Sequence, residues 1–372
     1  MKVFHCDHCD RVVFFENTVC VTCQRVLAYL PDLSEIGSLE AIDGDRFKSP
    51  LPAAKGRTYR LCRNYIEQGV CNWAIADDEG AQTLCRACRL TRIIPDLNVD
   101  GHREAWYRLE VAKRRLLYSL FSLNLPVVDK ATDPVGGLAF EFLADPDDPT
   151  APCVLTGHEN GVIRINLAEA DDAQREQRRS SMQEPYRTLL GHFRHEIGHY
   201  YWDHLIKGST RLDAFRVRFG DEQRDYTEAL QTHYQQGAPA DWPEHFVSAY
   251  GSSHPWEDWA ETWAHYLHME DTIQTAAACG LSLRPARRDE PVLPPIAEVS
   301  PGEAGSFDQM IARWFPITYV LNHLNRGMGL ADGYPFVLSS EAIEKLRFVH
   351  DTVARRVRRR RRESVSRRRA VA

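Results

Sequence analysis

The sequence predicts an α+β protein in which a cysteine-rich N-terminal region precedes a small β-sheet and a longer helical half. Three observations support this prediction. Two cysteine quartets fall within the first 88 residues, short apolar runs with turn signals occupy 138–167, and helical patterns fill most of the chain beyond them. The length of 372 residues leaves room for two or three modules.

The first quartet reads C-x2-C-x10-C-x2-C. Each C-x2-C pair forms a knuckle that can present two thiolates to one tetrahedral zinc ion, with a short hairpin between the pairs. Two disulfides are the alternative, but the N-terminus "MKVFHCDHCD" lacks the apolar core of a signal peptide that would lead to an oxidising compartment. We predict a zinc ribbon over residues 1–30, with the ligands Cys6, Cys9, Cys20 and Cys23.

The second quartet keeps one C-x2-C knuckle but places eight residues between its first two cysteines. Such a wide pair can still chelate zinc if the chain between them folds back, whereas isolated buried thiols are the alternative. We predict a second zinc module over residues 57–95, with the ligands Cys62, Cys71, Cys85 and Cys88. Residues 31–56, rich in Pro, Gly, Ser and Asp, are expected to form a linker or an irregular wrap.

Two further cysteines, Cys153 and Cys279, have no neighbouring Cys, His or basic residue to lower their pKa, so we expect inert buried thiols. Beyond the cysteines, apolar residues at helical spacing predict a helix from about Trp106 that Pro126 closes. Strands are expected at 138–144 and in a hairpin at 154–167, where Asn160-Gly161 signals a two-residue turn. Later helices are expected from Pro185 through Ile206, at 221–236, 255–278 and 307–325, and from Ser340 into the C-terminal tail.

The expected helix after Pro185 contains the pattern H-E-x-x-H. His195 and His199 are four residues apart and share a helix face, so both imidazoles can reach one ion, and Glu196 lies beside them to polarise a metal-bound water. A surface helix with two histidines is the alternative, but the apolar neighbours on this face would make unpaired histidines costly. The seventh and tenth positions after His195 are Trp202 and Leu205 rather than Gly and His, which excludes the metzincin class.

A zinc hydrolase needs a third protein ligand, and this one must come from another element. The best candidates are Glu257 and Glu261, which lie four residues apart on the expected helix after Pro255 and share one face. The alternatives are that these acidic side chains only favour the helix N-terminus, or that Asp203 on the H-E-x-x-H helix is the ligand.

The segments "CNW", "CRACRLTRIIPDL", "HEIGHYYWDHLI", "HPWEDWAETWAHYLHMED" and "LNRGMGLADGYPFVL" together resemble a bacterial family of zinc-binding metallopeptidases. This family pairs an N-terminal zinc ribbon with a gluzincin-like catalytic domain, and the resemblance covers most of the chain up to the tail. It implies a zincin-like peptidase domain over residues 96–345. It also implies that Glu257 is the third zinc ligand and that Glu261 accepts a hydrogen bond from a ligating imidazole, because "EDWAE" matches the family pattern.

We therefore expect a zinc-dependent peptidase that acts on a peptide or protein substrate, with Glu196 as general base and Tyr250 as a donor to the substrate carbonyl. One catalytic zinc ion and one or two structural zinc ions are expected. Residues Ile163, Arg164 and Ile165, in an edge strand over 161–167 beside the cleft, would bind an extended substrate through their backbone. The alternative is a zinc ribbon that recruits a protein partner while the peptidase site is vestigial.

The last expected segment, residues 346–372, is an Arg-rich helix or tail. Residues 355–369 hold ten Arg against one Glu, a local charge of +9, so the rest of the chain carries −15. We do not expect nucleic-acid binding, because the body is acidic and no aromatic residue lies among the arginines to stack on bases. Without a signal peptide or an apolar run of about 18 residues, we expect a cytoplasmic protein with no membrane span.

Overall fold

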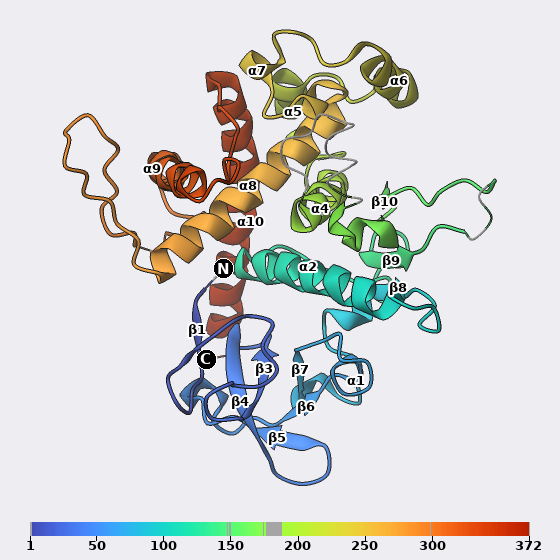
Figure 1. Cartoon of the computed structure of the whole chain (residues 1–372), viewed down its shortest axis with the longest axis vertical. Helices are drawn as coiled ribbons and strands as arrows, with labels where there is room; N and C mark the ends of the chain where they lie inside the picture. Colours follow the sequence, from blue (N-terminus) through green and yellow to red (C-terminus); the bar gives the residue numbers. More distant parts are fainter. Residues whose placement is uncertain are drawn as a thin grey trace. The chain divides into compact units, whose positions relative to one another are not determined.

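The computed structural model describes residues 2–371 except 147, 149, 174, 176–187 and 298, with side chains as far as Arg358 (Figure 1). The chain divides into two compact units. One contains residues 2–118 and 127–174, and the other contains residues 119–126 and 175–372. The predicted α+β class is confirmed, since the strands cluster in the first unit and most helices lie in the second.

The N-terminal unit contains an antiparallel five-stranded sheet in the order β3-β4-β5-β6-β7. Its apolar side chains form one core cluster that includes Leu30, Leu39 and Tyr59. A separate two-stranded hairpin, β1-β2, carries the first cysteine pair in the turn between its strands. The strands are β1 (Phe4–His5), β2 (Val12–Val13), β3 (Val26–Leu30), β4 (Glu35–Ala41), β5 (Arg46–Lys48), β6 (Tyr59–Leu61) and β7 (Ala74–Ala76).

The prediction of a linker over residues 31–56 is wrong, because β4 and β5 lie inside it and join the two cysteine-rich parts into one sheet. Glycine content made this segment resemble a loop. In the structure, Gly37 lies in β4, where an added Cβ would come within 2.7 Å of Ser49 Oγ and 2.8 Å of Leu30 Cδ1. Close packing, rather than a turn, therefore explains this glycine.

A second sheet in the same unit has the order β10-β11-β9-β8. Its predicted hairpin is confirmed: Asn160 and Gly161 both have positive φ angles, as a type I′ turn requires. The prediction that the strand at 161–167 is an edge strand is wrong, because β11 pairs with β10 on one side and with β9 on the other. The strands are β8 (Thr91–Ile93), β9 (Ala139–Leu143), β10 (Gly157–Glu159) and β11 (Val162–Asn166).

This internal position leaves β11 without free backbone groups for an extended substrate. Ile163 and Ile165 are fully buried, and Arg164 extends from the sheet to bond Glu141 on β9, with 3.1 Å between Nη2 and Oε2. Alternation of apolar and polar residues identified the strand correctly, but the parallel pairing with β9 has no local sequence signal. The substrate role expected for Ile163, Arg164 and Ile165 is therefore withdrawn.

The second unit is mainly helical. The helix expected at 255–278 is confirmed with those bounds, whereas the one expected at 221–236 begins at Tyr226, because Asp225 caps it by accepting a hydrogen bond from Glu228 N. The expected start at Pro185 lies outside the described residues. Within the described residues, the helices are α1 (Arg63–Ile66), α2 (His102–Ser122), α4 (Leu189–Leu205), α5 (Leu212–Phe219), α6 (Tyr226–Gln236), α7 (Trp242–His245), α8 (Pro255–Ala278), α9 (Ser306–Gly327) and α10 (Ser340–Val371).

The helices α4 and α8 pack directly against each other (Figure 1). At their closest approach Gly198 has no side chain, and a Cβ there would lie 3.0 Å from Ala260 Cα and 3.3 Å from Trp263 Cβ. The indole of Trp259 crosses the same interface and donates from Nε1 to the Gly198 carbonyl oxygen at 2.8 Å. This contact fixes the two helices at a short separation.

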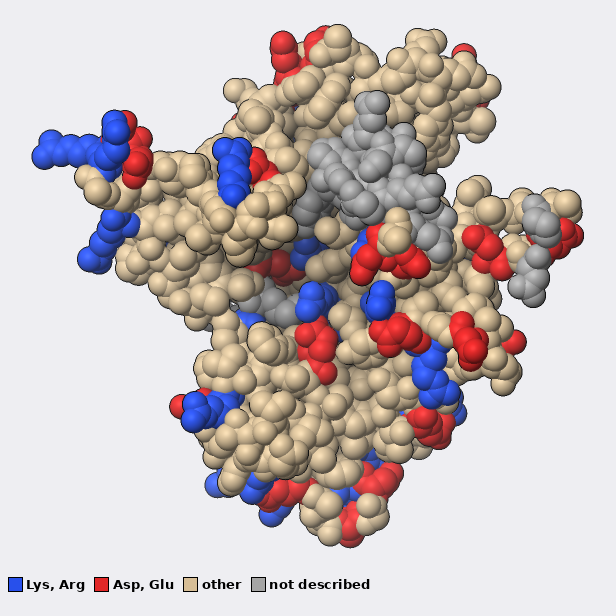
Figure 2. Space-filling model, viewed as in Figure 1, with Lys and Arg blue, Asp and Glu red and all other residues tan. Residues whose placement is uncertain are grey.

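On the face drawn in Figure 2, the described acidic and basic side chains are intermixed and form no large area of one sign. None of the described helices is long and apolar enough to cross a membrane. The predicted helix from Ser340 is confirmed and continues to Val371, although the side chains of most tail arginines lie outside the described part.

Candidate metal centres

The H-E-x-x-H helix and the start of α8 bring together three side chains that could hold a metal ion. His195 and His199 point from α4 with their Nε2 atoms 3.2 Å apart. The Glu257 carboxylate comes from α8, with Oε2 2.9 Å from His195 Nε2 and Oε1 3.5 Å from His199 Nε2. All three residues are buried. Tetrahedral zinc with ligands at about 2.0–2.1 Å places neighbouring ligand atoms about 3.3 Å apart, so these distances fit one zinc ion.

The hydrogen bonds around His195 support a cation at this point. Its Nδ1 lies 2.7 Å from Glu261 Oε1, and because a carboxylate only accepts, Nδ1 must carry the proton. When the ring is neutral, Nε2 then presents a lone pair toward the buried Glu257 Oε2, 2.9 Å away. Converging lone pairs repel unless a positive charge lies between them, and either a second ring proton or a metal ion can supply that charge.

The pKa shifts of His195 and Glu257 also indicate a site that favours positive charge. Burial by itself would lower the pKa of His195, yet its hydrogen bonds with Glu257 and Glu261 raise that pKa well above the ordinary value. Burial would raise the pKa of Glu257, but the charge of His199 and the bond to His195 hold it well below its usual range. Both glutamates remain ionised, so the site favours a cation.

Glu261 lies one turn after Glu257 and contacts His195 from the side away from the ligand atoms. Its second oxygen, Oε2, accepts a 2.6 Å hydrogen bond from Ser248 Oγ. The His195 and Ser248 hydrogen bonds together hold the carboxylate in one orientation, which in turn fixes the imidazole ring. Asp203, the rival ligand, lies outside the cluster and accepts a 3.2 Å bond from Lys207 Nζ.

Glu196 follows His195 directly and is buried. One of its oxygens lies 3.3 Å from Nε2 of His192, one turn earlier on α4. Burial would raise the pKa of Glu196, but this contact and the neighbouring histidines lower it, so Glu196 is a carboxylate, the form that a general base needs. Tyr250, in the turn before α8, has its ring centroid 5.9 Å from that of His195.

Two residues that contact the candidate ligands directly were not predicted from the sequence. Tyr226, the first residue of α6, donates a 2.7 Å hydrogen bond from its hydroxyl to Glu257 Oε1. Trp256 lies beside His199, with ring centroids 4.1 Å apart. Tyr226 precedes Glu257 by 31 residues in a polar segment, and no periodicity or motif links the two.

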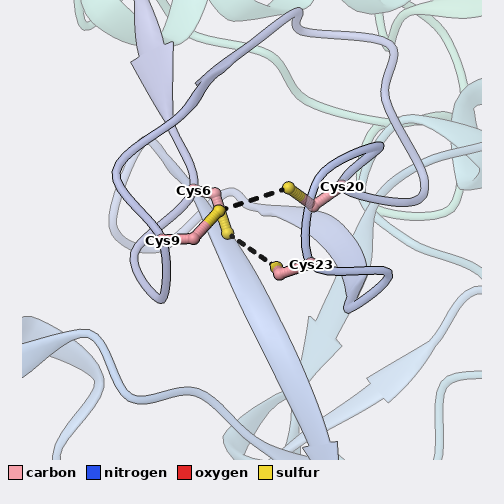
Figure 3. Close-up of side chains that lie close together, drawn as sticks. All are labelled: Cys6, Cys9, Cys20 and Cys23. Carbon is pink, nitrogen blue, oxygen red and sulfur yellow. Dashed lines mark hydrogen bonds between the residues drawn. The ribbon is translucent and has the colours of Figure 1, made fainter.

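The first cysteine quartet forms a compact cluster of sulfur atoms (Figure 3). The Sγ atoms of Cys6 and Cys23 are 3.7 Å apart, and those of Cys9 and Cys20 are 3.6 Å apart. Ligands at about 2.3 Å from a tetrahedral zinc ion lie about 3.8 Å from one another, so the cluster has the dimensions of a zinc tetrathiolate. All four thiols are free, which argues against the disulfide alternative.

The two knuckles of this quartet repeat one backbone pattern. In the first, Cys6 N donates to Arg11 O and Asp10 N donates to Cys6 O; in the second, Cys20 N donates to Arg25 O and Gln24 N donates to Cys20 O. Asp10 and Gln24, each the residue after the second cysteine, have φ angles of 58° and 60°. The same left-handed turn therefore shapes both ends of the ribbon.

The second quartet is also assembled, and it is entirely buried. Cys71 Sγ lies 3.7 Å from Cys85 Sγ. Two backbone amides point at the sulfurs, from Trp73 to Cys71 and from Cys85 to Cys62, each at 3.4 Å, as expected for thiolate acceptors. The wide spacing is bridged by α1, which folds the chain back between the first two cysteines. The remaining thiols, Cys153 and Cys279, are exposed, so the prediction that they are buried is wrong.

The two cysteine clusters and the His-His-Glu cluster define a zinc-binding protein. Two known families match the chain, and both bind zinc. A family described as "Putative zinc-binding metallo-peptidase" matches residues 102–352, and a zinc-ribbon domain matches residues 3–99. The chain belongs to this zinc-binding metallopeptidase family, and the resemblance inferred from its motifs is confirmed. The zinc-ribbon match covers both cysteine quartets and the segment between them as one domain.

Relatives of similar length exist in mycobacteria. The chain is 43% identical to Uncharacterized protein Rv2568c of Mycobacterium tuberculosis and to Uncharacterized protein Mb2598c of Mycobacterium bovis, over 355 residues that cover 95% of each chain. No solved structure matches the chain significantly.

Proposed function

We propose that the protein is a zinc-dependent peptidase whose catalytic ion is held by His195, His199 and Glu257. One observation carries this proposal: three buried ligand atoms from two helices converge at zinc-like distances, and an ionised Glu196 is adjacent to them. Three protein ligands leave a fourth tetrahedral position open, which distinguishes a hydrolytic site from a structural one. The metal supplies Lewis-acid polarisation of the substrate carbonyl and acidifies a bound water.

In this proposal Glu196 performs the proton transfers. It takes a proton from the attacking water as the water oxygen bonds to the carbonyl carbon, and it delivers that proton to the amide nitrogen as the C–N bond breaks. The carboxylate is buried beside His192, so bulk water competes little for its lone pairs. Glu261 and Ser248 keep the His195 ring in place throughout.

Tyr250 is our candidate donor to the oxyanion that develops on the substrate. Its ring lies next to His195, and among the described residues its hydroxyl has no hydrogen-bond partner. An uncommitted hydroxyl close to the ligands can donate to a new negative charge. Tyr250→Phe should then lower kcat without changing the zinc content.

We further propose one zinc ion in each cysteine cluster, which gives three equivalents with the peptidase site. Total metal analysis of the purified protein tests this number. Two equivalents, with all four thiols of the second quartet reactive toward a thiol reagent, would leave that quartet a set of buried cysteines.

The deciding experiment compares the wild type with Glu196→Gln, both checked for bound zinc, on a proteome-derived peptide library. The amide keeps the size of the side chain but cannot accept a proton, so cleavage should fall by about 10²–10⁴-fold. Equal cleavage by both proteins would point to a contaminating protease. No cleavage by either zinc-loaded protein under varied conditions would remove the peptidase proposal.

A partner-binding role for the zinc ribbon is the second candidate. The side chains of Val12, Phe14 and Val21 are 56%, 72% and 80% exposed, and all three lie in or beside the knuckles of the first quartet. Exposed apolar groups on a small metal-stabilised module are typical of a protein contact. If Phe14→Ser abolished co-purification of a defined partner while leaving the zinc content unchanged, this role would be supported.

A further inference from the structure

The hydroxyl of Tyr226 contacts the carboxylate that we assign as the third ligand. The role inferred below for this contact rests on the proposed function, because it requires a metal ion at the site. Glu257 is 1% exposed, so both of its oxygens need a partner inside the protein. Oε1 accepts the 2.7 Å hydrogen bond from Tyr226, whereas Oε2 faces His195 Nε2 at 2.9 Å. The two oxygens are therefore not equivalent.

We propose that Tyr226 is a positioning residue that holds Glu257 in a one-oxygen binding mode, with Oε2 directed at the metal. A carboxylate that rotates freely about its last bond can exchange its oxygens or bind through both of them. Anchoring Oε1 removes this freedom and keeps a coordination position open, which a hydrolytic zinc site requires. Tyr226 would then support Glu257 in the way that Glu261 supports His195.

The backbone around Tyr226 is built to keep the hydroxyl in place. Asp225 caps α6 and fixes the helix start at Tyr226. The preceding carbonyl, of Arg224, is 3.2 Å from Nε2 of His254, whose Nδ1 accepts a hydrogen bond from Trp256 N and so caps α8. One imidazole therefore joins the start of the helix that carries Tyr226 to the start of the helix that carries Glu257.

Burial also favours this specific role over general packing. Ala229 is the buried residue of α6, and the Tyr226 side chain is itself 37% exposed. A tyrosine that served only as an apolar contact would bury its ring and leave its hydroxyl in water. Tyr226 differs, because its hydroxyl contacts a buried carboxylate.

The test is the affinity of the helical site for zinc in Tyr226→Phe, which keeps the ring and removes only the hydroxyl. Full-length proteins are titrated with a competing chelator, and the equivalent that His195→Ala lacks identifies the helical site. Removal of a hydrogen bond to a metal ligand typically weakens metal binding by about 10- to 100-fold, and we expect a loss in this range with the cysteine-bound zinc unchanged. Tyr234→Phe, at an exposed position on the same helix, is the matched control and should bind zinc like the wild type.

Two results would overturn the assignment of Tyr226. They are an affinity within about twofold of the wild type in Tyr226→Phe, or an equal loss in the Tyr234→Phe control. A wild type that holds no zinc at the helical site would instead refute the proposed function, so the two failures can be told apart. Peptide cleavage is not needed for any of these measurements.

Discussion

The first cysteine quartet and the His-His-Glu cluster place ligands around a site in opposite ways. The ribbon takes its four sulfurs from 18 consecutive residues and shapes them with two copies of one tight turn, and the strand between its two cysteine pairs, β2, has only two residues. The helical site takes its ligands from residues 62 positions apart and holds them between two long packed helices. The ribbon therefore needs its metal to keep its shape, whereas helix packing can preserve the other site without an ion.

The largest effect should follow from removing ribbon ligands. Replacing both Cys6 and Cys9 by Ser should release one equivalent of zinc and unfold the hairpin, because structural zinc contributes about 10–16 kcal/mol of apparent binding free energy to such modules. Metal analysis and amide hydrogen exchange over residues 2–25 would report the two changes. The helical site should keep its zinc, and an unchanged total zinc content would refute the ribbon assignment.

The next largest effect should be on zinc retention at the helical site, where it distinguishes the proposed ligand Glu257 from Glu261, which holds a ligand in place. Glu257→Ala should abolish retention of the catalytic zinc, since two imidazoles alone leave the ion under-coordinated. Glu261→Ala should weaken zinc binding by about 10- to 100-fold without eliminating it. Asp203→Ala serves as the control and should bind normally. If Glu257→Ala kept full catalytic zinc while either of the other variants lost it, the ligand assignment would have to change.

A smaller effect should come from the helix contact that places these ligands. Gly198→Ala adds a methyl group 3.0 Å from Ala260 Cα, and overpacking of this kind typically costs about 1–3 kcal/mol. Urea denaturation of the zinc-loaded protein should show the loss as a lower midpoint. Gln231→Ala, on the exposed surface of α6, controls for helix propensity and should be close to neutral. A Gly198→Ala protein as stable as the wild type would show that α4 and α8 can move apart enough to accept the methyl group without loss of stability.

The last effect appears only at acidic pH and concerns the helical unit away from the metal. Burial lowers the pKa of His350 to about 4, and its Nε2 lies 2.9 Å from Ser306 Oγ. Because the unfolded chain binds the proton near pH 6.5, this histidine contributes full stability above that pH and loses it progressively as pH falls toward 4, by about 1.4 kcal/mol per pH unit. His350→Gln should lower the slope of the free energy of unfolding against pH over this window, by the amount that one bound proton contributes. Exposed His323→Gln should leave the slope unchanged, and equal slopes in all three proteins would contradict the assignment.

The contrast between the two sites also explains which parts of the structure the sequence could predict. Short-range patterns were sufficient for the cysteine knuckles, for the H-E-x-x-H helix and for α8, whose start is marked by Pro255. Pairings between distant segments had no such signal. The linker prediction failed at β4 because tertiary packing selected Gly37, and the edge-strand prediction failed at β11 because its parallel partner lies about 20 residues earlier.

Tyr226 illustrates the same limit inside the site. Its contact with Glu257 arises because His254 ties the turn before α6 to the cap of α8, and that bond joins residues 30 positions apart. A helix-capping rule identifies each helix start separately, but it does not show that the two starts meet.

The missing side chain at Gly198 sets how closely α8 approaches α4 beside the candidate ligands. Glu257 and Glu261 both lie on α8, so a bulkier residue at 198 would displace them together while leaving the two histidines on α4 where they are. The gap between the carboxylate and the imidazoles would widen by the thickness of one methyl group or less. Selectivity among metals of different radius can thus be tuned by a position that never touches the ion.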